Sequence, residues 1–214
     1  MESYQKAFIE LALEHQALRF GEFTLKSGRL SPYFFNVGQL NTGQALKALG
    51  ECYANAIRHA GIPFDVLFGP AYKGIPLACA TTIALAGEHQ LNIPYAFNRK
   101  EAKDHGEGGQ IIGTPLKGRI LIIDDVITAG TAIRESFQLI QANQAQVAGI
   151  IVALDRQEKG QGNLSAIQEI QSTFAINVKA IITFADIMEF VKKESAFSAF
   201  IGPMTAYREQ YGTA

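Results

Sequence analysis

The sequence predicts an α/β protein with a central, mainly parallel sheet flanked by helices. Three observations indicate this class: apolar runs of strand length recur along the chain, segments with helical periodicity separate them, and polar or glycine-rich loops follow several of the runs. Such unbroken runs are typical of strands that are buried on both faces. The 214 residues, of which 48% are hydrophobic, suffice for one domain with a full core.

The expected elements alternate along the chain. Residues 1–16 have the pattern of an amphipathic helix, and residues 20–36 contain two β-prone runs around a Lys-Ser-Gly-Arg turn, which predicts a hairpin. A long amphipathic helix is expected from about Asn41 to Gly61, because the glycine ends the pattern. Further strands are expected at 65–70, 93–98, 120–123, 147–154 and 178–183, and further helices at 75–86, 133–140 and 187–191.

The most informative stretch joins the strand at 120–123 to the helix that follows it. The strand ends in Asp124 and Asp125, and a loop of small residues leads into the helix: Val126, Ile127, Thr128, Ala129, Gly130, Thr131 and Ala132. Backbone N–H groups and hydroxyls of such a loop, at a helix N-terminus, favour a phosphate. No lysine follows the glycine, and no G-x-G-x-x-G follows a strand, so the usual patterns for nucleoside triphosphates and dinucleotides are absent.

An acid beside a bound phosphate repels it, so the two aspartates need a different part of the same ligand. A ligand that fits both parts has hydroxyls that bind the carboxylates at one end and a phosphate that binds the loop at the other. Ribose 5-phosphate has this layout. The stretch resembles the phosphoribosyl pyrophosphate (PRPP) signature of type I phosphoribosyltransferases, and the chain from hairpin to last strand is similar to the orotate phosphoribosyltransferases. The resemblance implies the type I phosphoribosyltransferase fold with an N-terminal hood. It also implies a reaction in which orotate and PRPP give orotidine 5′-phosphate and pyrophosphate.

The resemblance assigns roles to individual residues. Residues 1–40 would form the hood and residues 41–214 the PRPP-binding core, as one integrated domain with a flexible catalytic loop at about 99–110. Besides residues 124–132, the positions that match PRPP contacts are Lys26, Tyr72, Lys73, Arg99, Lys100, Lys103 and His105. The positions that match orotate contacts are Phe34, Phe35, Thr128 and Arg156. Lys103 and His105, with the two aspartates, are expected to be catalytic.

The residues alone leave several of these roles open. A lysine at the carboxyl edge of a sheet favours phosphate contact for Lys73 over a surface role. The charged segment 99–109 fits a closing arm and a solvated hairpin tip equally well, and a turn lysine and core aromatics would explain Lys26 and the Phe34-Phe35 pair. Arg156 could grip a ligand carboxylate or pair with Asp155 or Glu158.

Partners and location are also expectations. The resemblance implies Mg²⁺ held mainly through pyrophosphate and ribose hydroxyls, with no direct protein ligand, and a homodimer in which Lys100 and Lys103 reach the neighbouring subunit's site. A net charge of −1 gives no reason to expect nucleic acid or an anionic membrane. No apolar h-region is present at the N-terminus, and Cys52 and Cys79 fit buried free thiols, so a cytoplasmic protein is expected.

Three other functions fit part of the pattern. A purine phosphoribosyltransferase would share the Asp-Asp loop but would not need Arg156 or the hood. A PRPP-sensing regulator that binds nucleic acid could keep the fold without catalysis. Such a protein would need a basic face, and this function does not explain the charged segment 99–109. A phosphohydrolase using Asp124 and Asp125 as metal ligands would need further carboxylates or histidines at ligand spacing, and the sequence offers none that convinces.

Overall fold

The computed structural model of the protein describes residues 1–25, 27–103, 109–128 and 130–213, and the backbone alone for residues 102 and 103. Its central sheet has the strand order β5-β4-β3-β6-β7-β8, in which neighbouring strands are parallel except for the antiparallel edge pair β4 and β5. The strands are β3 (Val66–Gly69), β4 (Tyr95–Lys103), β5 (Gly109–Gly113), β6 (Arg119–Asp124), β7 (Gln146–Asp155) and β8 (Asn177–Thr183). The predicted α/β class with a mainly parallel sheet is confirmed.

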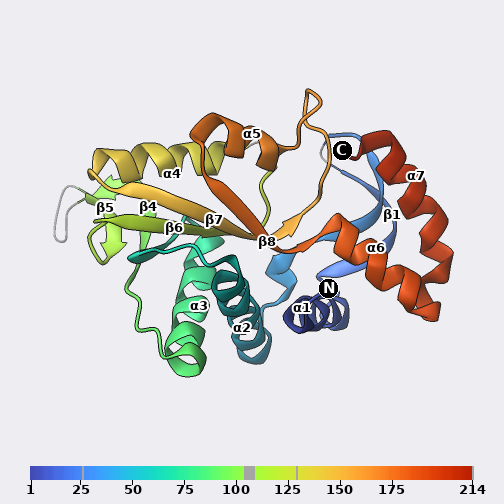
Figure 1. Ribbon diagram of the computed structural model, residues 1–214, viewed down its shortest axis with the longest axis horizontal. Coiled ribbons are helices and arrows are strands. Elements are labelled where there is room, and N and C mark those ends of the chain that lie inside the picture. The colour runs from blue at the N-terminus through green and yellow to red at the C-terminus, as the bar shows by residue number, and fades with distance from the viewer. Residues whose placement is uncertain (26, 104–108, 129, 214) are drawn as a thin grey trace.

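Helices cover both faces of this sheet (Figure 1). One face carries α1 (Ser3–Glu14), α2 (Gly43–Ala60) and α3 (Gly74–His89), and the other carries α4 (Thr131–Ala142) and α5 (Ala166–Phe174). Because both faces are covered, the central strands are apolar throughout, and residues 120–123 are fully buried. No helix in the described part of the chain is long and apolar enough to cross a membrane.

The predicted ends of α2 are correct, since local signals set them. The Thr42 hydroxyl accepts a hydrogen bond from the Ala45 N–H at 3.2 Å, which caps the first turn. At the other end Gly61 adopts the left-handed conformation and its N–H bonds to the carbonyl of Ile57. Between these ends Leu49, Tyr53 and Ile57 face the core, as the periodicity predicts.

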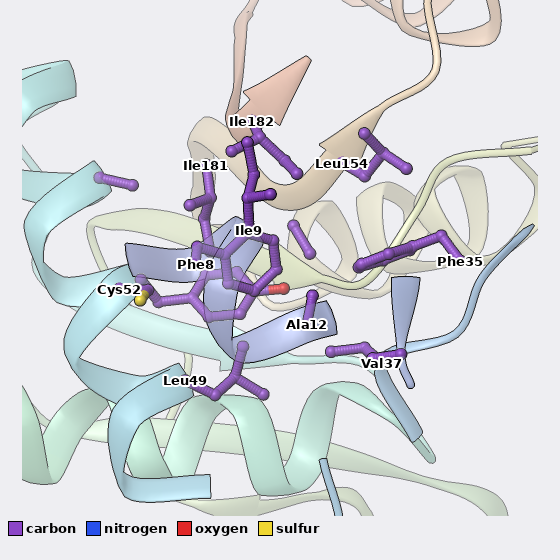
Figure 2. Packing of buried hydrophobic residues seen from close by; sticks show 14 of the residues in the cluster. Phe8, Ile9, Ala12, Phe35, Val37, Leu49, Cys52, Leu154, Ile181 and Ile182 are labelled. Carbon is purple, nitrogen blue, oxygen red and sulfur yellow. The ribbon is translucent and has the colours of Figure 1, made fainter. Parts of the chain in front are cut away.

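The larger core lies between α1, α2 and the sheet (Figure 2). Phe8 and Ile9 of α1 lie between Leu49 of α2 and the Ile181-Ile182 pair of β8. Phe35 reaches the same core from the N-terminal hairpin, with its ring 6.1 Å from that of Phe8. The hairpin is therefore joined to the core by buried apolar area rather than by a flexible connection.

The N-terminal hairpin forms a separate two-stranded antiparallel sheet of β1 (Leu18–Thr24) and β2 (Leu30–Phe35), as predicted. It lies at the β8 end of the central sheet, opposite β5, together with α6 (Phe184–Lys193) and α7 (Ile201–Tyr211) (Figure 1). Two short 3₁₀ helices, η1 (Val37–Gln39) and η2 (Ser195–Phe200), complete the described elements. Tyr207 of α7 packs against Tyr33 of β2, so the C-terminal helix supports the hairpin.

Two features differ from the sequence expectation. β4 continues through the charged residues to Lys103 and pairs with β5, because the Lys103 and Gly109 positions face each other in an antiparallel ladder. The expected loop at 99–110 is thus, in its described part, the end of a hairpin. Cys52 is buried, as expected, but Cys79 is half-buried, since it lies on the side of α3 that faces away from the sheet core.

Candidate functional site

The carboxyl edge of the sheet brings two predicted loops together. β3 pairs with β6 in parallel register, Leu67 opposite Leu121, so the loops that follow the two strands are neighbours. As a result Lys73, at the start of α3, places its Nζ 2.5 Å from Oδ2 of Asp125. The lysine side chain is 56% exposed while that of Asp125 is 15% exposed, so an incoming anion reaches the ammonium group first.

Asp124 is the more sheltered of the two acids. Burial and the neighbouring Asp125 carboxylate raise the pKa of Asp124 to about 7, although the Asp125 N–H donates to its Oδ1 at 2.9 Å. The buried hydroxyl of Tyr53 donates to the main-chain carbonyl of Asp124 at 2.8 Å. The Asp125 carbonyl accepts from the Ala153 N–H at 2.8 Å, so hydrogen bonds hold the backbone of both acids.

The loop after these acids has the form of an anion site at the N-terminus of α4. Gly130 precedes the helix in the left-handed conformation, with φ +71°, and a Cβ there would meet Ile170 at 3.2 Å. Ile127 is buried against the sheet, which leaves Thr128 and Thr131 exposed beside the helix N-terminus. Val126 is half-buried, Ala132 is exposed, and Ala129 lies outside the described residues.

The loop between β3 and α3 depends on a close approach of two glycines. A Cβ on Gly69 would lie 2.1 Å from the carbonyl oxygen of Gly74, so only glycine allows this tight turn. The Asn98 side chain of β4 accepts a hydrogen bond from the Ala71 N–H at 2.9 Å. Tyr72, which follows, is 68% exposed, and the Lys100 Nζ lies 5.1 Å from the centre of its ring.

The charged segment lies beside this loop but is only partly described. Arg99 is half-buried and Lys100 is exposed, both on β4. Lys103 is the last residue of that strand, with its backbone alone described. His105 and Lys26 lie outside the described residues. The structure therefore brings Tyr72, Lys73, Arg99, Lys100 and the Asp124–Thr131 region to one edge of the sheet.

The hairpin residues expected at the orotate pocket point in different directions. Phe35 is in the core, whereas the half-buried Phe34 lies on the opposite face of β2, 5.6 Å from the ring of Phe23 and with Arg19 over its ring. The alternation of side chains along a strand makes this unavoidable for neighbouring residues. Only one of the two rings can therefore face a ligand, and the other residue supports the hairpin through its backbone or its packing.

Arg156, which follows β7, lies at the same carboxyl edge and is largely buried. Its Nε and Nη2 both donate to Oε1 of Glu158, at 2.8 and 2.6 Å, and its Nη2 lies 3.3 Å from the Ser31 hydroxyl of β2. The guanidinium also stacks over the ring of Tyr33, 4.3 Å from its centre. Of the two roles that the residues left open, the pairing with Glu158 is therefore present; the hydrogen bonds of the guanidinium to described residues use Nε and Nη2 but not Nη1.

Sequence reasoning missed several residues that hold the site. Tyr53 and Asn98 fix the backbone near Asp124 and Ala71, and Ser31 and Tyr33 hold Arg156. These residues are far in sequence from the groups that they contact, so no local sequence pattern predicts the contacts. Only Glu158, two residues from Arg156, had a signal in the sequence, namely a carboxylate next to the arginine.

Taken together, the edge offers hydrogen-bond acceptors for hydroxyls at Asp124 and Asp125, an anion loop at 126–132, and cations at Lys73 and Lys100. No group of three or more His, Cys, Asp or Glu side chains that could hold a metal ion occurs among the described residues. A ligand with hydroxyls between two anionic ends fits this arrangement.

Comparisons with known proteins agree with this chemistry. Residues 36–182 match the family model described as a phosphoribosyl transferase domain. An orotate phosphoribosyltransferase of Shewanella oneidensis is 58% identical over 212 residues, which are 99% of each chain, and one of Actinobacillus pleuropneumoniae is 59% identical over 99% of this chain and 100% of the relative. The crystal structure of an orotate phosphoribosyltransferase from Francisella tularensis is similar with a TM-score of 0.87 and 44% identity, covering 96% of this chain and 99% of that one.

Proposed function

The chain belongs to the orotate phosphoribosyltransferases of the phosphoribosyl transferase family, and we propose how its residues carry out that reaction. The protein is a pentosyltransferase of pyrimidine biosynthesis, which transfers the 5-phosphoribosyl group of PRPP to orotate. One observation supports the residue roles most directly. Two acids, a lysine and the N-terminus of α4 meet at one sheet edge, although residues 73 and 125 are far apart in sequence.

We assign the ribose 5-phosphate to this group. The carboxylates of Asp124 and Asp125 would accept hydrogen bonds from the two ribose hydroxyls, and residues 126–132 would hold the 5-phosphate through backbone N–H groups and the hydroxyls of Thr128 and Thr131. The exposure of both threonines beside the helix start supports this role. The acids then contact hydroxyls rather than phosphate, so their charge does not oppose binding.

The pyrophosphate would occupy the cationic side of the same edge. Lys73 leaves Asp125 and binds the departing group, with Tyr72, Arg99 and Lys100 from the neighbouring elements, and with Lys26, Lys103 and His105 as the resemblance implies. This exchange of partners is favourable because Asp125 accepts a hydrogen bond from a ribose hydroxyl when Lys73 moves from Asp125 to the phosphates. Neither charge is left without a partner.

Orotate would lie on the hood side of the ribose, between β2 and the end of β7. Its carboxylate would accept from Nη1 of Arg156, and Thr128 and the Phe34-Phe35 segment would complete the pocket. Hood residues 1–40 would then cover the base while residues 41–214 hold the PRPP. Arg156 is held in part by Ser31, so the hood and the core are already joined at this point.

The chemistry needs no covalent intermediate on the protein. The C1–O bond of PRPP breaks with its electron pair going to pyrophosphate, a ring nitrogen of orotate forms the new bond to C1 from the opposite face, and the proton of that nitrogen passes to the departing pyrophosphate or to solvent. As the bond stretches, the ribose gains positive charge near Asp124 and Asp125, and the pyrophosphate gains negative charge near the cations. The site therefore acts by position and electrostatics, and the closed arm excludes water that would hydrolyse PRPP.

Phosphoribosyltransferases generally use Mg²⁺ with PRPP, and we propose the same here. The two adjacent carboxylates of Asp124 and Asp125 fit a metal held mainly by the ligand, because they are proposed to bind the ribose hydroxyls. Bound in that way, Mg²⁺ would supply positive charge to the pyrophosphate. Asp124 and Asp125 would orient the hydroxyls that share it.

We also propose a homodimer with shared sites. The outward side of α3 carries exposed apolar residues at helical spacing, Pro76, Ile83 and Ala86, and the exposed Tyr72 of the preceding loop continues this stripe. Ile83 is 74% exposed, and the stripe begins at the Tyr72 loop of the site. A second chain bound there would bring its own arm, with Lys100 and Lys103, close to this site. The free thiols of Cys52 and Cys79 fit a cytoplasmic location, which we also propose.

An absorbance assay of orotate consumption tests the function directly. Orotate with PRPP and Mg²⁺ should react, the same mixture without Mg²⁺ should react far more slowly, and adenine or hypoxanthine should not replace orotate. Turnover of a purine instead would refute the base assignment. For the shared site, Lys103→Ala should lower turnover by about a hundredfold. Mixing it with Asp125→Asn should restore part of the activity, and no recovery would mean independent sites.

A further inference from the structure

We propose that Glu158 is the positioning residue for Arg156 and sets the direction from which the arginine meets the carboxylate of orotate. The inference rests on the role of Arg156 proposed above. Without a fixed partner, an arginine side chain samples many rotamers and loses much of its directional value. Glu158, Ser31 and Tyr33 hold this guanidinium through Nε, Nη2 and one face, so Nη1 points in a defined direction.

One edge of the guanidinium belongs to Glu158. A single carboxylate oxygen, Oε1, accepts from both Nε and Nη2 of Arg156, at 2.8 and 2.6 Å. The two side chains are 15% and 13% exposed, so water competes little for these bonds. The hydrogen bonds that the described residues form with the guanidinium use Nε and Nη2, which leaves the two N–H groups of Nη1 for a ligand.

Residues of the hood then hold the pair. The fully buried Tyr33 stacks under the guanidinium, and its hydroxyl donates to the same Oε1 of Glu158 at 3.3 Å. The Ser31 hydroxyl donates its one hydrogen to the Tyr33 carbonyl at 2.7 Å, so its oxygen is free to accept from Nη2 of Arg156. Nε of Arg156 and the Tyr33 and Ser31 hydroxyls therefore each have a described acceptor, which favours one arrangement of these three groups.

The backbone around Glu158 is held as well. The Lys159 N–H donates to the Tyr211 carbonyl at 2.8 Å, and the Thr213 N–H donates to the Gln157 carbonyl at 2.9 Å. Arg29 of the hood turn donates to the Lys159 carbonyl at 2.9 Å and stacks over the ring of Tyr211. Tyr211 and Thr213 of the C-terminal segment thus hold the loop that carries Arg156 and Glu158.

The net charge near Arg156 allows two roles of Glu158 to be distinguished: positioning of the arginine, and competition with orotate for it. Glu158 neutralises part of the arginine's charge, so a carboxylate ligand would bind more tightly without it if charge alone mattered. If direction matters more, removal of the carboxylate weakens orotate binding although the local charge becomes more positive. The two views predict opposite signs for the same substitution, which makes the experiment decisive.

Affinities for orotate and PRPP should be measured separately for Glu158→Ala and Glu158→Gln. The alanine variant releases the guanidinium, and we expect the orotate KM to rise about tenfold or more with kcat and the PRPP KM nearly unchanged. The glutamine variant keeps an acceptor oxygen for Nε and Nη2, so its orotate KM should stay within about threefold of the original. Glu189→Gln, at a surface ion pair with Lys193, makes the same chemical change elsewhere and is the control.

The double variant gives the signature of action through Arg156. In an Arg156→Ala background the Glu158→Ala change should have no further effect on orotate. Tighter orotate binding by either Glu158 variant, equal loss of both substrates, or full additivity in the double variant would each overturn the proposal. If Arg156→Ala alone leaves orotate binding intact, the proposed role of Arg156 fails as well, which distinguishes that failure from a failure of Glu158 alone.

Discussion

The raised pKa of Asp124 predicts that the substitution Asp124→Asn makes the folded protein less sensitive to pH. Burial and the Asp125 carboxylate raise this pKa from an ordinary value of 3.8 to about 7. In the unfolded chain the group loses its proton near pH 4, but in the folded chain it keeps the proton until about pH 7. Between these values the folded state binds more protons, so the free energy of unfolding falls as the pH rises.

The size of the effect follows from the two pKa values. The difference is about three pKa units, and at about 1.4 kcal/mol for each unit this gives about 4 kcal/mol. Because the side chain is partly exposed, solvent screens part of the energy, and we expect a loss of about 2 to 4 kcal/mol between pH 4 and pH 7. Above pH 7 both states are deprotonated and the loss is complete.

Urea unfolding followed by circular dichroism measures this loss, since the chain has no tryptophan for fluorescence. Other groups also titrate, among them Asp155, whose pKa burial raises as well. The informative quantity is therefore the change between pH 5 and pH 8 in the original protein minus the change in Asp124→Asn, at one protein concentration. The asparagine variant should lose less stability over this interval.

A control variant makes the comparison specific. The Lys193 ammonium lowers the pKa of Glu189, so its titration lies below pH 5, and Glu189→Gln should leave the change between pH 5 and pH 8 as it is in the original protein. If Asp124→Asn and the original protein lose the same stability over that interval, Asp124 is not protonated in the folded state and the reasoning is refuted. Because Asp125→Asn removes one cause of the shift, it should show an intermediate loss.

Three further predictions follow from the described contacts. Arg156→Ala should weaken orotate binding about a hundredfold in calorimetric titration while PRPP affinity stays within about twofold, and equal losses would make the arginine structural. Ile83→Asp should shift the protein toward single chains in analytical ultracentrifugation because it puts a charge on the α3 stripe, whereas Leu164→Asp, at another exposed apolar residue, should not. Tyr53→Phe should lower the free energy of unfolding by about 1 to 3 kcal/mol, because the Asp124 carbonyl loses a buried donor; unchanged urea midpoints would contradict this.

Local signals explain what the sequence could predict. The strands of the central sheet are continuous apolar runs because both faces are buried, and α2 has a threonine cap and a glycine stop. The position of Asp124 and Asp125 at a strand end likewise needed no more than the end of an apolar run. Since parallel strands end at the same edge of a sheet, their loops were expected to meet there.

Long-range pairing explains what the sequence could not predict. The extension of β4 through charged residues depends on β5, and neither segment has the apolar pattern of a strand. In α7 only Met204 and Tyr207 are buried, so its sequence lacks an amphipathic period although it supports the hood. Tyr53 and Ser31 act on Asp124 and Arg156 from 71 and 125 residues away, and such contacts exist only once the chain has folded.

The strand order also explains why one site can hold three chemical groups in line. From the arm to the hood, the neighbouring strands are β4, β3, β6 and β7. The last residues of β4 include Lys100, and the other three strands lead to the Lys73 loop, to the two aspartates and to Arg156. Neighbouring strands lie about 4.8 Å apart, so the edge from β3 to β7 spans about 10 Å. In the proposed function these strands contact, in this order, the pyrophosphate that leaves, the ribose, and the base that replaces the pyrophosphate. Under that proposal, exchanging β3 and β8 would separate Lys73 from the two aspartates, so the order of the strands would matter as well as the identity of the residues.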